Sequence, residues 1–440
     1  MKTIGIIAEF NPFHNGHAHL LDAARRQFGA DHIIVIMSGD HVQRGEPALL
    51  DKYARTRMAL EAGADLVLEL PVPFAAGSAQ YFARGAVSAL LHTGMVDSIL
   101  FGSECGDITL LYAASAGHSA PQNAAAGQCA ISMAEPPVPE SQRHTGCTIP
   151  MAERHSPNDL LAIEYLKALD FFHSDISVET IPRAGAGYHA PLPAGGFASA
   201  SALRAAFLKA PCFVFPGSSA SRQMSDTVSV PKQQHAQPPT DPAQPSVSPE
   251  EISLYMPAAS YRLTAEYTQT KRLLTFADYS DLIYYALLSH AQEGLTAYFD
   301  VYDDLSQKIL AHLEHYADVL SFISMLKSKD IAYSHLSRAL LHILLHIRTE
   351  HVQTLIDEYN YCPYLRLLGF CRNSSAALLH GVKANADRPI LSKLADAKQL
   401  LKPSALAQLK RDIFASALYA KTASKKGGPT NEYRQKIIIL

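Results

Sequence analysis

The chain of 440 residues lacks the marks of a secreted, metal-binding or membrane protein. Its 6 Cys are scattered, without a CxxC pair or a Cys/His ligand set, which is typical of a reduced intracellular protein. Its longest apolar run, 339–347, contains two His and is too short to cross a bilayer. Asn11-Pro12 interrupts the N-terminal apolar run too early for a signal peptide. We therefore expect a cytoplasmic protein without a membrane partner.

Neither sign of charge dominates the composition. The 38 Lys and Arg against 41 Asp and Glu give a net charge of −3, so nothing global demands nucleic acid or a membrane surface. Tryptophan is absent, but 20 Tyr are present, and neither fact excludes a function. With 48% hydrophobic residues, the chain can bury a sizeable core and form two or three domains.

The N-terminal stretch is the most informative part of the sequence. Residues 3–8 are apolar and rich in Ile, as expected of a strand buried on both faces of a parallel sheet. Asn11-Pro12 ends that strand, and from His17 onwards apolar residues recur at helical spacing. His14, Gly16 and His17 therefore lie at a strand-to-helix junction.

Such a junction suits a phosphate, because free backbone N–H groups and the positive end of the helix dipole meet there. Gly16 would let the backbone approach the ligand. The imidazoles of His14 and His17 could donate to phosphate oxygens and stabilise charge on a leaving pyrophosphate. The alternative is two ordinary loop histidines, but the paired spacing and the glycine favour the functional interpretation. The HxGH pattern resembles the signature of the HIGH-type nucleotidyltransferases, whose members bind ATP there and attack its α-phosphorus.

Strands and helices alternate through the first half of the chain. Predicted strands at 32–37, 65–70, 96–101 and 176–181 are separated by predicted helices, which end with 159–171. This order indicates an α/β fold with a doubly wound parallel sheet, resembling the Rossmann and HIGH nucleotidyltransferase folds. Ligands of such sheets bind beyond the carboxyl ends of the strands. The polar loop 38–47 is predicted to lie at that edge.

Further polar residues follow strand ends or begin helices. Asn158 begins a predicted helix, so it either caps that helix or reaches a nucleotide. Arg183 follows a strand and suits the ATP phosphates or the adenine edge, although a lone Arg is often a surface residue. Gly102 is either a turn residue or a position where a side chain would clash with a base or ribose. Ser199, Ser201 and Arg204 open the next helix, where they suit phosphate, although the hydroxyls could simply cap it.

Other polar residues are weaker indications of a site. His342 and His346 are four residues apart, but no third ligand lies nearby in the sequence, so a packed helix is favoured and no metal-binding residue is predicted. Candidates for contact with a second substrate are Asp40, His41, Gln43, Arg44, Lys52 and Arg55.

Composition divides the chain into three parts. Residues 1–210 form the predicted ATP-binding domain, 211–252 a Pro/Ser/Gln-rich linker or insertion, and 253–440 a mostly helical domain. Helices are predicted at 278–290, 306–326, 335–359 and 403–419. The tail from residue 402 carries eight Lys and Arg against Asp412 and Glu432, which suits RNA phosphates or an ordinary solvated surface.

Several long strings resemble the bacterial tRNA(Met) cytidine acetate ligase family through most of residues 1–210 and more loosely beyond. They are EFNPFHNGH, MSGDHVQRGEPALLDK, ADLVLELP, FGSE, SPNDLLAIEYLKAL, RAGAGYH, ASASALR and NEYRQKIIIL. Relative to that family, 117–151 looks long and 216–249 inserted, and neither interrupts a site motif.

The resemblance implies a reaction of ATP with acetate to give acetyl-adenylate, Mg²⁺ on the phosphates, and acetyl transfer to N4 of the wobble cytidine of elongator tRNA(Met). His14 and His17 would be the catalytic residues. The helical half would bind the tRNA, and no protein partner is evident. Ser199, Ser201 and Arg204 would hold the phosphate chain. Carried over by motif, the ATP site would comprise Ile7, Ala8, Glu9, Phe10, Asn11, Pro12, Phe13, His14, Asn15, Gly16, His17, Ala18, His19, Leu20, Gly102, Asn158 and Arg183.

Two other functions remain open from the residues alone. An adenylyltransferase that makes a dinucleotide-type coenzyme would use the same site, but it would not need the large helical half. A non-catalytic RNA-binding protein could keep the fold, but it would not need His14, Gly16 and His17 intact.

Overall fold

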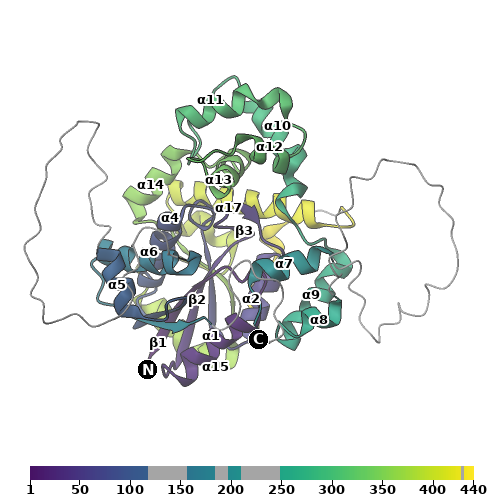
Figure 1. Ribbon diagram of the computed structural model, residues 1–440. Coiled ribbons are helices and arrows are strands. Elements are labelled where there is room, and N and C mark those ends of the chain that lie inside the picture. Colours follow the sequence, from purple (N-terminus) through teal and green to yellow (C-terminus); the bar gives the residue numbers. More distant parts are fainter. Residues whose placement is uncertain (117–155, 184–196, 210–247, 428–430) are drawn as a thin grey trace, which may run out of the picture.

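The computed structural model describes residues 1–116, 156–183, 197–209, 248–427 and 431–440 (Figure 1). The predicted excursion at 117–151, the loop 184–189 and most of the predicted linker 211–252 lie outside these described residues. Within them, no helix combines the length and the hydrophobicity that crossing a membrane requires.

The central sheet confirms the doubly wound prediction. Parallel strands run in the order β5-β2-β1-β6-β7, so the chain builds outward from β1 in one direction and then returns to build in the other. The point of reversal lies between β1 and β6, where sheets of this type bind ligands. The strands are β1 (Thr3–Ala8), β2 (His32–Ser38), β5 (Leu66–Leu70), β6 (Ser98–Ser103) and β7 (Ser177–Pro182).

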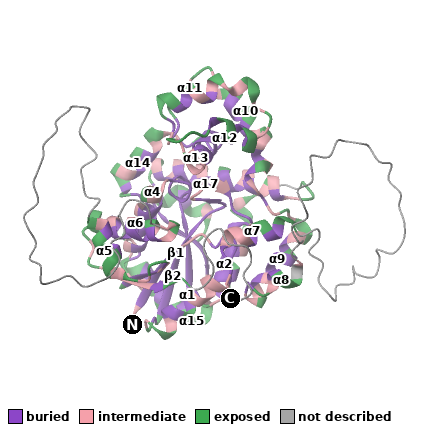
Figure 2. Ribbon diagram, in the orientation of Figure 1, coloured by how far each residue is buried: buried purple, intermediate pink, exposed green. Residues whose placement is uncertain are grey.

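Helices cover both faces of this sheet, because its strands are apolar on both faces. Ile4 and Ile6 of β1 belong to one hydrophobic core and Ile7 to the other, as the two-residue period of a strand requires. Figure 2 shows the strands buried and the exposed residues on the outer sides of the helices. The first core includes residues of α1 (Asn15–Arg26), α2 (Lys52–Glu61) and α7 (Ala200–Lys209), and the second residues of α3 (Val72–Ala75), α4 (Ala79–Leu91), α5 (Ile108–Ala116) and α6 (Pro157–Phe171).

The C-terminal half is mostly helical, as predicted, but it also contains three strands that its pattern did not indicate. Strand β8 (Leu365–Phe370) pairs antiparallel with β5, and β9 (Ile390–Leu391) and β10 (Ile438–Ile439) pair parallel with β8. A short apolar run between helices does not reveal by periodicity whether it is helix or strand. The pairing partner of β8 lies about 300 residues earlier, at Leu66–Leu70, so local sequence does not indicate it.

Two of the predicted C-terminal helices are each divided in two. The predicted helix 306–326 is interrupted at Asp318. The carboxylate of Asp318 accepts from the backbone N–H groups of Leu320 and Ser321 and so caps the start of a new helix. The predicted helix 335–359 is interrupted at His346, because its φ of 53° lies outside the range of an α-helix. The helices are α9 (Ala258–Thr270), α10 (Ser280–His290), α11 (Asp303–Ala311), α12 (Val319–Leu326), α13 (Tyr333–Leu344), α14 (Thr349–Tyr359), α15 (Arg372–Asn385), α16 (Ala397–Leu400) and α17 (Pro403–Ala423).

The end of the predicted linker is helical. Helix α8 (Pro249–Ser253) begins with a capping box in which Ser248 and Glu251 bond each other's backbone N–H groups. Ile252 of α8 belongs to the same core as Ile4, so the chain rejoins the sheet domain there.

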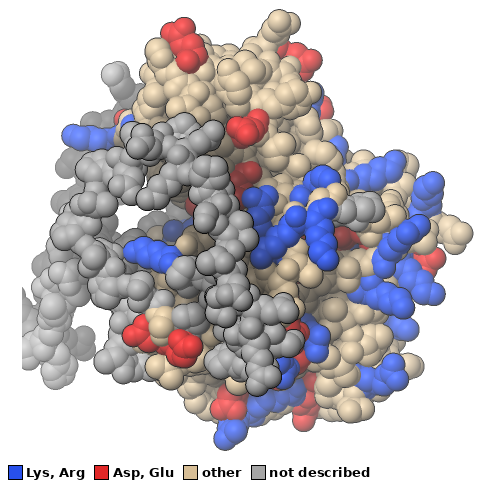
Figure 3. Space-filling view, turned by 90° about the vertical axis from the view of Figure 1, so that its right-hand side faces the viewer, with Lys and Arg blue, Asp and Glu red and all other residues tan. Residues whose placement is uncertain are grey.

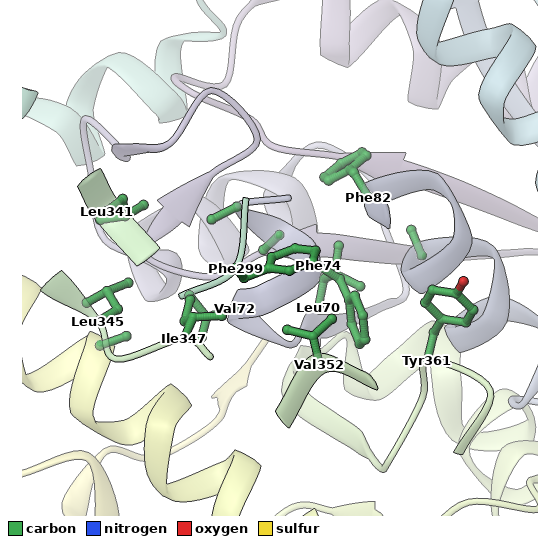
Figure 4. Close-up of a cluster of buried hydrophobic side chains, with 14 of the residues drawn as sticks. Leu70, Val72, Phe74, Phe82, Phe299, Leu341, Leu345, Ile347, Val352 and Tyr361 are labelled. Carbon is green, nitrogen blue, oxygen red and sulfur yellow. The ribbon is translucent and has the colours of Figure 1, made fainter. Parts of the chain in front are cut away.

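Apolar side chains from both halves of the chain form one continuous cluster (Figure 4). Leu70, Val72 and Phe74 from the sheet domain lie beside residues of α13, α14 and the loops around them. The rings of Phe74 and Tyr361 are 5.4 Å apart. Because both halves share this core, the helices of the C-terminal half have a fixed position relative to the sheet.

A buried network of charges also joins the halves. The ammonium of Lys52, which is fully buried, lies 2.9 Å from Glu69 Oε1 and 2.8 Å from Glu432 Oε1. Arg366 of β8 lies 2.9 Å from Glu69 Oε2 and 2.6 Å from Glu432 Oε1. Burial by itself would raise the pKa of Glu432, but Lys52 and Arg366 outweigh it and lower that pKa to about 2. Glu432 thus stays charged, and its pairing with Lys52 and Arg366 attaches the C-terminal tail to the first domain.

Replacing Lys52 by Met should lower the free energy of unfolding by about 3–5 kcal/mol, because it leaves buried carboxylates without their partner. Urea unfolding followed by circular dichroism measures the change. Lys410→Met, at an exposed position on α17, is the control and should change the value by less than about 0.5 kcal/mol. A loss below about 1 kcal/mol for Lys52→Met would contradict this role.

Candidate active site

A cavity of about 620 Å³ opens at the carboxyl ends of β1, β6 and β7, at the switch point of the sheet. Of the predicted site residues, Pro12, Phe13, Asn15, Ala18 and Ser201 do not line it. The predicted residues that do are Ile7, Ala8, Glu9, Phe10, Asn11, His14, Gly16, His17, His19, Leu20, Gly102, Asn158, Arg183, Ser199 and Arg204.

His14 and His17 cap helix α1 reciprocally. Nδ1 of His14 accepts from the backbone N–H of Gly16 at 3.0 Å, and Nδ1 of His17 accepts from the backbone N–H of His14 at 3.2 Å. The two rings stack with their centroids 3.8 Å apart. This is a capping box in which imidazoles take the places usually held by Ser or Thr and Glu or Gln.

The protonation state of both rings follows from this capping. Because each Nδ1 accepts a hydrogen bond, it carries no hydrogen, and the neutral ring must carry its hydrogen on Nε2. Burial, aided by the charges of Arg183 and Arg204, lowers the pKa of His14 to about 3. Burial, His14 and Arg183 lower the pKa of His17 well below its usual value. The site therefore holds two neutral Nε2–H donors.

The helix start does not offer the free backbone N–H groups that the sequence pattern suggested. The N–H of Asn15 donates to Tyr255 O at 2.9 Å, that of Gly16 to His14, and that of His17 to His14 O at 2.9 Å. A Cβ on Gly16 would lie 2.8 Å from Cε1 of His14, so the glycine is needed to make room for the imidazole. The donors available to a phosphate here are thus side chains.

Gly102, Asn158 and Arg183 meet at one wall of the cavity. Arg183 donates its backbone N–H to Ser103 O at 2.9 Å, and its Cγ would lie 3.3 Å from a Cβ placed on Gly102. Gly102 therefore makes room for Arg183. Both Asn158 and Arg183 contact the carboxylate of Glu104, which the prediction of site residues missed.

The contacts described for three further predicted site residues, Ser199, Ser201 and Arg204, stabilise the protein itself. The hydroxyl of Ser199 accepts from the backbone N–H of Ala202 at 3.2 Å, as a helix cap does, and lies 3.1 Å from that of Ser201. Arg204 donates to the backbone carbonyl of Asn11 at 2.8 Å, which fixes the turn before His14. Its guanidinium also lines the cavity and supplies positive charge there.

The loop predicted to contact a second substrate divides into two groups. Gln43 and Arg44 line the cavity, and the Gln43 N–H donates to Glu9 Oε1 at 2.7 Å. The side chains of Asp40, His41, Lys52 and Arg55 are buried. Arg55 donates to the backbone carbonyls of Leu50, Glu9, Ser38 and Gly39, and so holds the loop in place.

Other lining residues had no signal in the local sequence. Glu46 lies in the same loop as Gln43 and Arg44. Ser334 comes from α13 of the C-terminal half. Apolar lining is supplied by Phe82, Phe101 and Tyr165. In the part of the chain that the structure describes, no group of three or more His, Cys, Asp or Glu could hold a metal. His342 is buried, with its ring nitrogens 2.9 and 3.0 Å from the carbonyls of Phe299 and Ala76.

Comparison with known proteins identifies the family of this chain. The family model described as HIGH Nucleotidyl Transferase matches residues 1–434, which defines the class of protein. A tRNA(Met) cytidine acetate ligase of Acetivibrio thermocellus is 30% identical over 452 residues, with 100% of both chains covered. Another of Clostridium perfringens is 33% identical over 430 residues, with 90% of this chain and 91% of the relative covered. The chain belongs to the tRNA(Met) cytidine acetate ligase family of HIGH nucleotidyl transferases.

Solved structures share the fold over the whole chain. The apo structure of Thermotoga maritima TmcAL gives a TM-score of 0.78 at 24% identity, with 100% of both chains covered. TmcAL of the same organism bound with alpha-thio ATP gives 0.77 at 23% identity, also with 100% of both chains covered.

The capping predicts that His14 and His17 stay neutral with hydrogen on Nε2 between pH 5 and 8. Nitrogen-15 NMR of the imidazoles should show this tautomer without a titration near 6.5, whereas the same residues in denaturant should titrate there. Since only the unfolded histidines take up protons below pH 6.5, the free energy of unfolding should fall as the pH drops from 6.5 towards 3. A folded-state titration near 6.5 would contradict the capping.

Proposed function

We propose that this chain is an ATP-dependent ligase that activates acetate as acetyl-adenylate and transfers the acetyl group to N4 of the wobble cytidine of elongator tRNA(Met). The observation that carries the proposal is the pair of neutral Nε2–H donors, His14 and His17, in a cavity at the switch point of the sheet. Relatives 30% and 33% identical, which align with 100% and 90% of this chain, are named tRNA(Met) cytidine acetate ligases, and these names support acetate and tRNA(Met) as substrates. Since tRNA is a cytoplasmic molecule, we expect the enzyme to act in the cytoplasm.

The first step joins acetate to the α-phosphorus. A carboxylate oxygen of acetate forms the new O–P bond, the bond from the α-phosphorus to the bridging oxygen breaks, and pyrophosphate leaves with the electron pair. Negative charge grows on the phosphate oxygens during this step. The Nε2–H groups of His14 and His17 would donate to those oxygens, and Arg204 and Arg183 would add positive charge.

Mg²⁺ would be held mainly by the triphosphate and water, because it usually takes only one or two protein carboxylates in nucleotide sites. Glu9 and Glu46 line the cavity, and either could supply such a carboxylate. When bound, Mg²⁺ would neutralise part of the phosphate charge.

The second step transfers the acetyl group to RNA. N4 of the cytosine attacks the acetyl carbonyl carbon, AMP leaves, and N4 gives up one proton. The wobble base lies in a single-stranded loop, so it can turn out of its stack and enter the cavity. Ser334 of α13 lines the cavity, so the C-terminal half, which we propose binds the tRNA, also reaches the reaction site.

A basic cluster supports the proposed binding of tRNA. The end of α9 contacts the end of α17, where the Arg272 N–H donates to Ala423 O at 2.7 Å. This contact gathers Arg272, Lys421, Lys425 and Lys426, which are all exposed. Figure 3 shows Lys and Arg gathered on the face of the molecule that carries these helix ends. The two acidic residues of the tail, Asp412 and Glu432, are largely buried, so they reduce its positive surface little.

The reaction itself is tested by incubating the chain with ATP, radiolabelled acetate and bacterial tRNA. Nuclease digestion should yield labelled N4-acetylcytidine only when ATP is present. No label in RNA, but an AMP-containing coenzyme formed from another small substrate, would favour an adenylyltransferase instead.

His17→Gln should separate capping from catalysis. A Gln at this position can accept from the His14 N–H, as in an ordinary capping box, but it lacks the Nε2–H donor. We expect an unchanged melting temperature and a fall in kcat for acetyl-adenylate formation of about 10²–10³-fold. His315→Ala, at an exposed position outside the cavity lining, should leave both unchanged. Wild-type kcat in His17→Gln would contradict the role of the imidazole.

Reversing the charge at Lys425 and Lys426 should weaken tRNA binding roughly tenfold near 0.1 M salt and flatten its salt dependence. The affinity for ATP should not change, because these residues do not line the cavity. Filter binding at several salt concentrations measures the effect. The matched control reverses Lys327 and Lys329, which are exposed near the end of α12. Equal losses in the two double variants would argue against a specific RNA surface.

A further inference from the structure

The carboxylate of Glu104 holds together one wall of the cavity. Glu104 follows β6 directly and lines the cavity. Its Oε1 accepts a hydrogen bond from the side-chain amide of Asn158 and lies 3.5 Å from Nη1 of Arg183. Its Oε2 accepts from the hydroxyl of Ser156. Side chains from two separate segments, the end of β7 and the start of α6, therefore converge on this carboxylate at the end of β6.

The backbone of Glu104 is also fixed. Its N–H donates to Asp159 Oδ1 at 2.9 Å, and the N–H of Cys105 donates to the same oxygen at 3.2 Å. Asp159 is buried in the first turn of α6. The carboxylate of Glu104 is thus held at a defined place relative to Asn158, one residue before Asp159.

This contact determines which way the amide of Asn158 points. An amide has hydrogen-bond donors on its nitrogen and an acceptor on its oxygen, whereas a carboxylate can only accept. Glu104 therefore engages the nitrogen of Asn158, and the amide oxygen is left for another donor. Because Asn158 lines the cavity, a ligand that offers an N–H group can meet that oxygen.

The charges divide the cavity into two ends. Arg183 lowers the pKa of both His14 and His17, so its charge acts on the histidines on one side while Glu104 neutralises it on the other. The histidine donors attract a triphosphate, whereas the carboxylate of Glu104 repels it. Glu9 and Glu46 also line the cavity, and the proposed Mg²⁺ would offset their charge. The base of a bound nucleotide therefore belongs at the wall formed by Glu104, Asn158 and Gly102.

We propose that Glu104 is a positioning residue that selects adenine. It fixes the amide of Asn158 so that the oxygen accepts from the exocyclic amino group of adenine. Guanine has a carbonyl oxygen at the equivalent position. That oxygen and the Asn158 oxygen are both acceptors, so they would face each other without a hydrogen bond. This inference rests on the proposed function, because it assumes that ATP binds in this cavity.

The test measures the Kd of ATP and of GTP by isothermal titration calorimetry, without acetate or tRNA. Glu104→Met keeps the length of the side chain and removes the acceptor, whereas Glu104→Gln keeps an acceptor and removes the charge. Asn158→Ala and the double variant Glu104→Met/Asn158→Ala complete a cycle. Glu179→Met, on the neighbouring strand β7 and outside the cavity lining, is the matched control. The melting temperature of each variant is recorded.

We expect Glu104→Met to weaken ATP binding roughly tenfold and to lower the preference for ATP over GTP, with kcat at saturating ATP changed much less than KM. Glu104→Gln should keep the preference, and the double variant should be no worse than Asn158→Ala. A wild-type preference in Glu104→Met, or fully additive losses in the double variant, would overturn the inference. If the wild-type chain binds no ATP at all, the proposed function fails first and this inference with it. If Glu104→Met does not fold, Glu104→Gln decides the matter. Loss of its preference for ATP over GTP would overturn the inference, and an unchanged preference would support it.

Discussion

The buried pairing of Lys52 with Glu69 and Glu432 is the interaction on which the arrangement of the whole chain depends. Glu69 lies on β5, Arg366 on β8 and Glu432 near the C-terminus, and these charged groups neutralise one another away from water. Leaving one of them unpaired would be costly, so the C-terminal strands are held beside the first sheet. Exposing these paired charges to water would require the two halves to separate. The two halves therefore act as one framework around the cavity.

In the candidate active site, two side chains also have more than one role. Helix α1 needs caps for its first N–H groups, and His14 and His17 supply them with the nitrogen that faces the helix. The opposite nitrogen of each ring then carries the hydrogen and is available to a phosphate. In the proposed function, one edge of each imidazole caps the helix and the other would bind phosphate, and Gly16 is needed because the His14 ring occupies the space of a Cβ. Neutral donors keep their hydrogen over a wide range of pH.

Local sequence was sufficient for much of this architecture. The strand Thr3–Ala8 and the α/β order of the first 182 residues follow from apolar periodicity, because burial on both faces requires apolar residues in every register. That residues after the strand ends line one cavity was predictable too, since parallel strands bring their carboxyl ends to one edge. Asp40, His41, Lys52 and Arg55 resembled ligand contacts in the sequence, yet they are buried structural groups, because polarity in a loop does not say what the side chain faces.

The sequence by itself determined the class of fold, the HxGH turn and the family, because these depend on residues close together in the chain or on strings shared with relatives. Only the tertiary structure decided that β8 joins the first sheet and that Glu432 completes a buried network. It also decided that Glu104, Asn158 and Arg183 meet at one wall. These contacts join residues that are far apart in the chain. Their energy comes from burial and charge pairing in three dimensions, which no local pattern encodes.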